Sequence, residues 1–251
     1  MKEENNQRIK EYYEKFNLER ILKFILKDNR PIIFDVGANV GNTIIEYKNY
    51  WPEAKIHAFE PQEDCFKALE VISENFKGDI FVNNVAVGIE HNHILEFYTH
   101  DINSEISGFS KINLSSNDSI FLKKIKMGKS NFSMDDYERT VNHKKLVKTI
   151  RLDKYLEENC IDKINLLKID TQGYEPEVLS SLGSFLSKTD IVLTEIMFFD
   201  YYEKKLSFSD IERVLLPAGF ELYNILHVSQ NPMNGRTDWI DVIYVNKNLL
   251  K

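Results

Sequence analysis

The sequence predicts an α/β fold in which a mostly parallel sheet is covered by helices on both of its faces. From Pro31 onward, short apolar segments with strand character alternate with segments of helical spacing, and the links between them are short. This alternation is typical of strand–helix–strand units, in which each helix packs on the sheet that its flanking strands build. The first expected elements are strands at 31–35, 55–60 and 79–85 and helices at 42–50 and 62–76.

Length and composition fit a chain with one sizeable core. The chain has 251 residues, of which 43% are hydrophobic. We expect a helical extension at 1–30 and one domain at 31–251, with an insertion at about 101–148.

No apolar run is long enough for a membrane span, and the start of the chain is no signal peptide, so we expect a cytoplasmic protein. The net charge of -7 argues against a nucleic-acid partner. Cys65 and Cys160 are expected to be free thiols.

The extension is predicted to be a helix at 3–27, because apolar residues recur at helical spacing between Lys and Glu. Such a helix packs either on the side of its own domain or on a second copy of the chain, which makes a homodimer an expectation. The other interpretation is a lid over the ligand.

A glycine-bearing turn follows the first strand in the segment PIIFDVGANVG. Glycine permits backbone conformations closed to other residues and a close approach of a ligand. The N–H groups at the start of the next helix then face that ligand. The dinucleotide fingerprint G-x-G-x-x-G is not met, because asparagines stand at its second and third glycine positions. The residues expected to contact a ligand here are Asp35, Gly37, Asn39, Gly41, Asn42 and Thr43.

The second strand also ends in an acid, in the segment KIHAFEP. Glu60 lies about one strand–helix unit beyond the glycine turn, where a carboxylate can accept hydrogen bonds from both ribose hydroxyls. Glu60 and Pro61 are therefore expected at a nucleoside. Two acids without a phosphate-binding glycine suggest a nucleoside with an amino-acid end, and S-adenosylmethionine is the common cofactor of that shape. Ala86, after the third strand, is expected near the adenine.

The remaining elements continue the alternation. Residues 101–148 are too long for an ordinary connection and carry many lysines, among them Lys123, Lys124, Lys126 and Lys129. This basic insertion is either a solvated loop or a segment whose positive charge attracts a phosphorylated or nucleotide-linked acceptor. Further elements are strands at 93–100, 146–152, 164–170 and 191–196, helices at 154–159 (capped by Asp153), 174–182 and 207–215, and an antiparallel pair of closing strands at 219–226 and 241–246.

Several of these blocks, in this order, resemble the FkbM family of S-adenosylmethionine-dependent methyltransferases. They are FDVGANVGNT, HAFEPQ, NNVAVG, TIRLDKYL and LLKIDTQGYEPEVL, and they extend from about Pro31 to about Ile196. The resemblance implies a class I methyltransferase (Rossmann-like) fold, with a mostly parallel seven-stranded sheet and an antiparallel closing strand. It also implies O-methylation of a sugar or natural-product hydroxyl, and it puts Ser107 near the adenosine. One departure is Gln172, where the family usually has an acid.

Methyl transfer to a hydroxyl requires a base at the acceptor oxygen. Asp170, at the end of a buried strand, is the first candidate for this role and is also expected near the cofactor. Glu175 would orient it or the acceptor, and Glu195 lies near the exit of another core strand. His100 and His227 are further candidates. The local alternative is that Asp170 caps the following helix and Glu175 interacts with the dipole of that helix.

These observations leave three functions open. The first is O-methylation of a hydroxyl on a sugar or surface-glycan precursor, as in capsule or other polysaccharide biosynthesis. The acceptor would be a small molecule or a nucleotide-linked sugar. The second is methylation of a phosphate- or phosphoramidate-type oxygen, which the basic insertion favours, and the third is nucleoside binding without catalysis. His91 and His93 are expected on one strand face, where two imidazoles would suit a metal ion, but no third ligand is near and no metal is expected. Trp239 is either a stacking platform for a sugar or a core residue.

Overall fold

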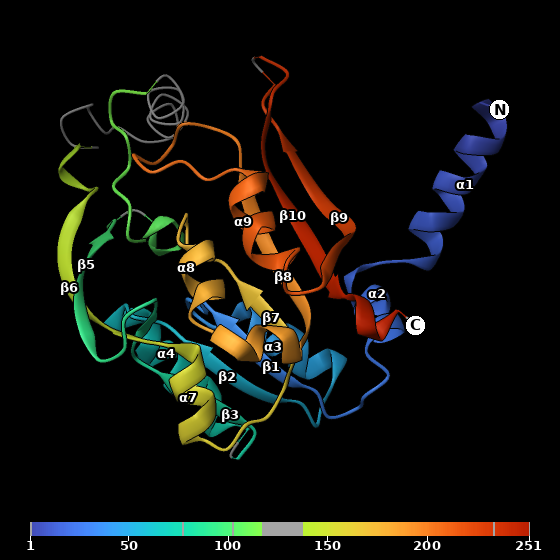
Figure 1. Cartoon of the computed structure of the whole chain (residues 1–251). Coiled ribbons are helices and arrows are strands. Elements are labelled where there is room, and N and C mark those ends of the chain that lie inside the picture. The colour runs from blue at the N-terminus through green and yellow to red at the C-terminus, as the bar shows by residue number, and fades with distance from the viewer. Residues whose placement is uncertain (1, 77, 102, 117–137, 233, 251) are drawn as a thin grey trace.

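A seven-stranded sheet forms the centre of the molecule, here described by a computed structural model that covers residues 2–76, 78–101, 103–116, 138–232 and 234–250 (Figure 1). Its strands are β1 (Ile32–Val36), β2 (Lys55–Phe59), β3 (Ile80–Asn83), β7 (Ile164–Ile169), β8 (Thr189–Met197), β9 (Phe220–Gln230) and β10 (Thr237–Asn246). Their order is β3-β2-β1-β7-β8-β10-β9. The first five run parallel, while β10 pairs antiparallel with both β8 and β9. The predicted mostly parallel sheet with an antiparallel closing pair is confirmed.

Helices cover both faces of this sheet, as predicted. On one face lie α2 (Leu18–Ile25), α3 (Asn42–Tyr50) and α4 (Glu63–Glu74), and on the other α7 (Leu152–Glu158), α8 (Glu175–Ser180) and α9 (Phe208–Leu215). Successive strand residues alternate between the two resulting cores. Ile33 and Leu166 pack toward the first set of helices, and Phe34 and Leu167 toward the second. Both faces of the central strands are therefore buried, which explains their continuous apolar character.

The N-terminal extension is two helices, so the prediction of one helix at 3–27 is wrong. The chain breaks after α1 (Lys2–Lys15), and Asn17 starts α2 because its side chain accepts a hydrogen bond from the Arg20 N–H at 2.9 Å. The second helix buries Ile21, Leu22 and Ile25 against the sheet, whereas α1 projects away from the body of the molecule (Figure 1).

A second, three-stranded sheet lies on the side of the molecule opposite to α1 (Figure 1). Its strands are β4 (Ala86–Val87), β5 (His93–Thr99) and β6 (His143–Ile150), in the order β4-β6-β5. The third strand of the main sheet ends at Asn83 instead of at the expected residue 85, and Ala86 belongs to the second sheet. In addition, β6 begins inside the expected insertion. The middle of that insertion, with Lys123, Lys124, Lys126 and Lys129, lies outside the described residues.

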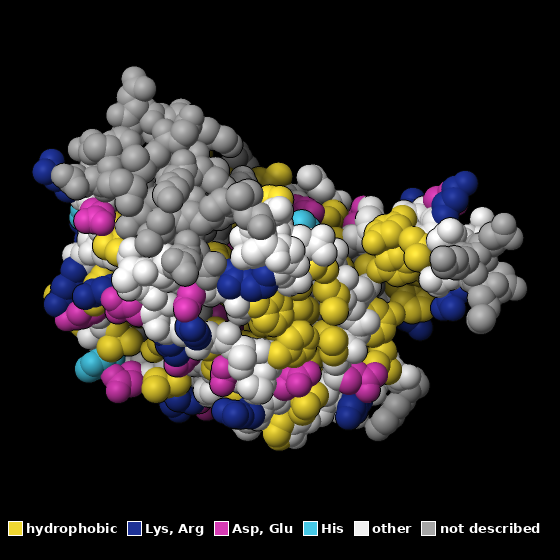
Figure 2. Space-filling model, turned by 90° about the horizontal axis from the view of Figure 1, so that it is seen from above, with side chains coloured by type: hydrophobic (Ala, Val, Ile, Leu, Met, Phe, Trp, Pro, Cys, Tyr) yellow, Lys and Arg dark blue, Asp and Glu magenta, His cyan; other side chains and the backbone are white. Residues whose placement is uncertain are grey.

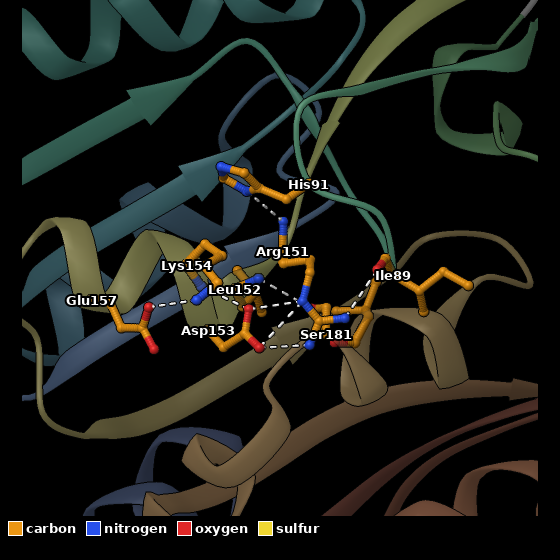
Figure 3. Close-up of polar contacts among 9 residues, drawn as sticks. Ile89, His91, Arg151, Leu152, Asp153, Lys154, Glu157 and Ser181 are labelled. Atoms are coloured by element: carbon orange, nitrogen blue, oxygen red, sulfur yellow. Dashed lines mark hydrogen bonds and ion pairs between the residues drawn. The ribbon is translucent and has the colours of Figure 1, made fainter.

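A polar network fixes the junction between β6 and α7 (Figure 3). Arg151, and not Asp153 as predicted, is the N-cap residue of α7. The Asp153 carboxylate accepts hydrogen bonds from the Arg151 Nε at 2.9 Å and from the Lys154 N–H at 2.7 Å. The Arg151 N–H donates to His91 Nδ1 at 3.3 Å, and its Nη1 donates to the Ile89 carbonyl at 2.9 Å. His91 precedes β5 and does not share a strand face with His93. No metal-ligand group occurs in the described part of the chain.

Large apolar side chains remain exposed on α1 and on the edge strand β9. On β9 these are Leu222, Tyr223, Ile225 and Val228. Hydrophobic side chains gather near the middle of the face seen from above and again toward the side where α1 projects (Figure 2). Among the described helices, none is both long and apolar enough to cross a membrane. Cys65 and Cys160 are both free thiols, as expected.

Candidate active site

A cavity of about 510 Å³ opens where the parallel strands end. Ligands of open α/β sheets bind at this edge, because the loops after neighbouring strands converge there. Glu195, Met197 and Trp239 come from β8 and β10, and the loop that includes Phe199 and Tyr201 closes that end. Most of the predicted site residues line the cavity: Gly37, Asn39, Asn42, Thr43, Glu60, Pro61, Ala86, Ser107, Asp170 and Glu195. Asp35, Gly41 and Glu175 do not.

The strand order sets the sequence of side chains across the cavity. Glu60 follows β2 at one end, Gly37 and Asn39 follow β1, and Asp170 follows β7 in the middle. Glu195 on β8 comes next, opposite Asp241 on β10. One site thus has a polar end at β2 and an acidic and aromatic end at β8 and β10, with the Asp170 carboxylate between them.

Glu60 is held in place before any ligand arrives. One carboxylate oxygen accepts a hydrogen bond from the Asn39 N–H at 2.9 Å, and the other accepts from the Gln62 N–H at 2.8 Å. Asn39 adopts a left-handed backbone with φ of 45°, which directs its N–H toward the acid. Burial raises the pKa of Glu60, and the two N–H donors work against that shift. Each oxygen retains a further lone pair for a hydroxyl donor.

The glycines of the first turn also serve the packing of the protein, a role that the sequence did not indicate. A Cβ on Gly37 would lie 2.0 Å from the Asp170 carbonyl oxygen, and one on Gly41 would lie 2.6 Å from the Ile72 side chain. Both have positive φ, which favours glycine. Asp35 is fully buried beneath the turn instead of facing the cavity.

Ser107 lines the cavity, where a bound nucleoside would supply a hydrogen-bond partner for its hydroxyl. Its side chain is buried, and its hydroxyl has no hydrogen-bond partner in the described structure. A buried hydroxyl without a partner is costly, so a polar ligand atom in the cavity would stabilise it. Ala86, Phe97 and Phe109 provide apolar surface in the same cavity. This combination suits a flat, heteroatom-containing ring.

A charged row runs from the core into the cavity. The Lys168 ammonium lies 3.3 Å from Asp35 Oδ1 and 3.5 Å from Asp170 Oδ2. Burial alone would lower the pKa of Lys168, but the two carboxylates outweigh it and hold that pKa above its ordinary value. The Asp170 side chain is 41% exposed, whereas that of Lys168 is 11% exposed. Asp170 therefore presents a carboxylate to the cavity with a permanent cation behind it.

Gln172 fixes the orientation of the same carboxylate. Its Nε2 donates to Asp170 Oδ1 at 2.7 Å, and its Oε1 accepts from the Tyr202 hydroxyl at 2.7 Å. The Tyr202 hydroxyl also lies 2.9 Å from the Ile106 carbonyl oxygen. Because the tyrosine donates to the amide oxygen, the amide nitrogen is directed to Asp170. The residue that departs from the family pattern is thus a hydrogen-bond donor to the proposed base.

We expect Gln172→Glu to move the acid limb of the pH–rate profile to higher pH. The substitution replaces a donor with a second carboxyl group beside Asp170, and adjacent carboxyl groups tend to share one proton. Activity should fall by about tenfold or more below neutral pH and recover at alkaline pH. Gln7→Glu, on the exposed surface of α1, is the matched control. A profile that coincides with that of the wild type would contradict this role of Gln172.

Glu175 does not face the cavity, and its expected role at the acceptor is not supported by its position. Its buried carboxylate accepts hydrogen bonds from the N–H groups of Thr171 and Gly173, at 3.0 and 3.1 Å, and from the Thr171 hydroxyl at 3.1 Å. These contacts hold the turn that follows Asp170. His100 and His227 also lie outside the cavity lining.

Glu195 is the most perturbed acid of the cavity. Burial raises its pKa well above the ordinary value, and the nearby charges of Asp170 and Asp241 add to the effect. An acid whose pKa is raised on folding stabilises the native state below the unfolded pKa, and this stability is lost as the pH rises through the folded pKa. We therefore expect Glu195→Gln to raise the melting temperature more at pH 8 than at pH 5. An equal shift at both pH values would contradict this.

Sequence reasoning missed the groups that support Asp170. Lys168 is part of the mostly apolar strand β7, INLLKI, and only the pairing of β7 with β1 brings it to Asp35. Tyr202 and the aromatic residues Phe199 and Tyr201 follow β8 in a segment without a recognisable motif. A lysine inside an otherwise apolar strand was the one available signal, because such a side chain needs an acidic partner.

The fold and the cavity together define a class I methyltransferase. An S-adenosylmethionine molecule fits the residues present: Glu60 would hold the ribose, Ser107 and the apolar surface around it the adenine, and the turn at Gly37 to Asn39 with the start of α3 the amino-acid end. The unpartnered Ser107 hydroxyl and the prealigned Glu60 carboxylate are the observations that favour this assignment.

The chain belongs to the FkbM methyltransferase family, whose domain matches residues 35–222. It is similar to the 2-O-methyltransferase NoeI of Sinorhizobium fredii, with 25% identity over 86% of this chain and 86% of the relative. It also resembles the hexuronic acid methyltransferase AglP of Haloferax volcanii, with 24% identity over 70% of this chain and 61% of the relative. These comparisons confirm the predicted family, enzyme class and cofactor.

A solved structure has the same fold. The FkbM methyltransferase of Methylobacillus flagellatus KT aligns with a TM-score of 0.50 and 12% identity, over 86% of this chain and 44% of that one. The present chain therefore spans less than half the length of that protein.

Proposed function

We propose that this protein methylates a hydroxyl group of a sugar, as part of a glycan precursor, with Asp170 as the base. The observation that carries the proposal is the position of the Asp170 carboxylate between the nucleoside end of the cavity and its aromatic end. The names of the two relatives, a 2-O-methyltransferase and a hexuronic acid methyltransferase, support a sugar acceptor. Polysaccharide biosynthesis in the cytoplasm is the proposed setting.

In this proposal each residue has a separate task. S-adenosylmethionine supplies a methyl group activated on a sulfonium. Asp170 accepts the proton of the acceptor hydroxyl as its oxygen attacks, with Gln172 and Lys168 holding the carboxylate in one orientation. Glu60 holds the nucleoside, and the aromatic side chains at the other end exclude water and position the acceptor ring.

The test is methyl transfer from labelled S-adenosylmethionine to a panel of glycosides and nucleotide sugars. Transfer to a hydroxyl, located by mass spectrometry and NMR, would support the proposal. Methylation only at phosphate- or phosphoramidate-type oxygens would favour the second function that the sequence leaves open. Cofactor binding without transfer to any acceptor would favour the non-catalytic one.

The predicted homodimer remains a proposal. The apolar side chains exposed on α1 and on β9 are the surfaces that a second copy would cover. Light scattering of the purified chain would test it, and a monomer at micromolar concentration would contradict it.

A further inference from the structure

The charges at the acceptor end of the cavity are unbalanced. Four acids line the described cavity, namely Glu60, Glu105, Asp170 and Glu195, against a single basic side chain, Lys168. Lys168 is already paired with Asp35 and Asp170. The two acids nearest the acceptor end, Asp170 and Glu195, are backed by Asp241 from the neighbouring strand.

Other cations near this end are directed elsewhere. Lys204 pairs with Glu177 at 2.6 Å, and Arg236 pairs with Asp238 at 3.3 Å. Neither lines this cavity, but Lys204 and Lys205 line a much smaller pocket beside Glu195, Met197 and Phe199. Lys205 is paired there with Asp200 at 2.7 Å. An anionic group on the acceptor would therefore enter a partly buried site with no free cation among the described lining residues. Burying a charge without a partner is strongly unfavourable.

The same end offers an apolar wall. Phe199 stacks on Tyr201, with ring centroids 5.6 Å apart and an interplanar angle of 20°. The ring centroids of Phe199 and Trp239 are 6.0 Å apart. Trp239 pairs with Met197, two residues along β8 from Glu195, so Met197 and Glu195 point to the same face. Aromatic rings bury the C–H face of a pyranose, while carboxyl groups beside them bind its hydroxyls.

We infer that the acceptor end, formed by Asp170, Glu195, Met197, Phe199, Tyr201 and Trp239, binds an uncharged pyranose ring and discriminates against uronates and sugar phosphates. This inference rests on the proposed function and narrows its substrate class. It separates this chain from a relative named for hexuronic acid methylation, and it disfavours the phosphate-type acceptor.

The experiment compares glucose-based rings with and without a negative charge, with the full chain saturated with S-adenosylhomocysteine. Saturation-transfer NMR titrations would use methyl β-D-glucopyranoside, methyl β-D-glucopyranosiduronate and α-D-glucose 1-phosphate. We expect both anions to bind at least about tenfold more weakly than the neutral glycoside, because each would lie among acids. Equal or tighter binding of either anion would overturn the inference. So would a failure of all three sugars to bind.

A pair of variants tests whether the acids cause the preference. Above pH 9, Glu195 is ionised because its raised pKa is about 9. Under these conditions Glu195→Gln should narrow the difference in affinity between the neutral glycoside and the uronate by about threefold or more, because one nearby negative charge is removed. Glu203→Gln, an exposed acid outside the cavity, should leave it unchanged. If Glu195→Gln leaves the ratio of the two affinities, for neutral glycoside and for uronate, unchanged, the inference is contradicted. Binding of the neutral glycoside without methyl transfer to any acceptor would instead overturn the proposed catalysis and still support the neutral-ring site.

Discussion

Replacement of Asp170 by Asn is expected to abolish most of the turnover while leaving cofactor binding nearly intact. The amide keeps the shape of the side chain but cannot accept the proton of the acceptor hydroxyl. General-base catalysis contributes about 10²–10⁴-fold, and kcat should fall by that factor. The affinity for S-adenosylhomocysteine, measured by calorimetry, should change by only a few-fold because Glu60 and Ser107 are untouched.

The matched control is Asp162→Asn, an exposed acid in the loop before β7, at the end of the strand away from the cavity. It should behave as the wild type in both measurements. Turnover of Asp170→Asn within a few-fold of the wild type would show that Asp170 is not the base, and an acceptor oxygen that needs no base would then be favoured. If the affinity for S-adenosylhomocysteine falls together with turnover, Asp170 instead binds the nucleoside of the cofactor.

The sequence predicted the architecture well because the buried strands are continuous apolar runs with glycine or acid at their ends. β7 and β8 occur within two residues of the strands expected at 164–170 and 191–196, and α3 occurs at the expected residues 42–50. The first helix was mispredicted because apolar spacing continues across Asn17, while the local capping hydrogen bond of Asn17 decides where the helix restarts. β4 was missed because a two-residue strand carries no periodicity.

The sequence predicted the site residues that directly follow strands. It missed the residues whose role depends on a partner far away in the chain. Glu60 and Asp170 follow strands and point outward, so position in the chain sufficed. Glu175 has the same kind of position, yet three donors of the preceding turn occupy its carboxylate. No pattern distinguishes an acid that binds its own turn from one that faces a cavity. The Gln172–Tyr202 hydrogen bond joins residues thirty apart in the chain, and only the folded structure reveals it.

Replacement of Glu60 by Gln should weaken S-adenosylhomocysteine binding by about 2–3 kcal/mol, or roughly 30- to 150-fold, as expected for hydrogen bonds to a charged group. Both Glu60 oxygens accept from backbone N–H groups, of Asn39 and of Gln62. In the variant, an NH₂ group must face one of these donors, so the turn at Asn39 is also disturbed. Calorimetry on the purified variant gives the loss directly.

Glu63→Gln, on the exposed first turn of α4, is the control for removing an acid close in sequence. It should bind the ligand as the wild type does. Thermal melting without ligand separates binding from folding. If the variant without ligand melts at a much lower temperature, destabilisation explains the weaker binding, and the role of Glu60 is to hold the turn at Asn39. A normal melting temperature with weak binding would make it the ribose ligand. An affinity within about threefold of the wild type would contradict both roles, since either requires a hydrogen bond worth at least about 1 kcal/mol.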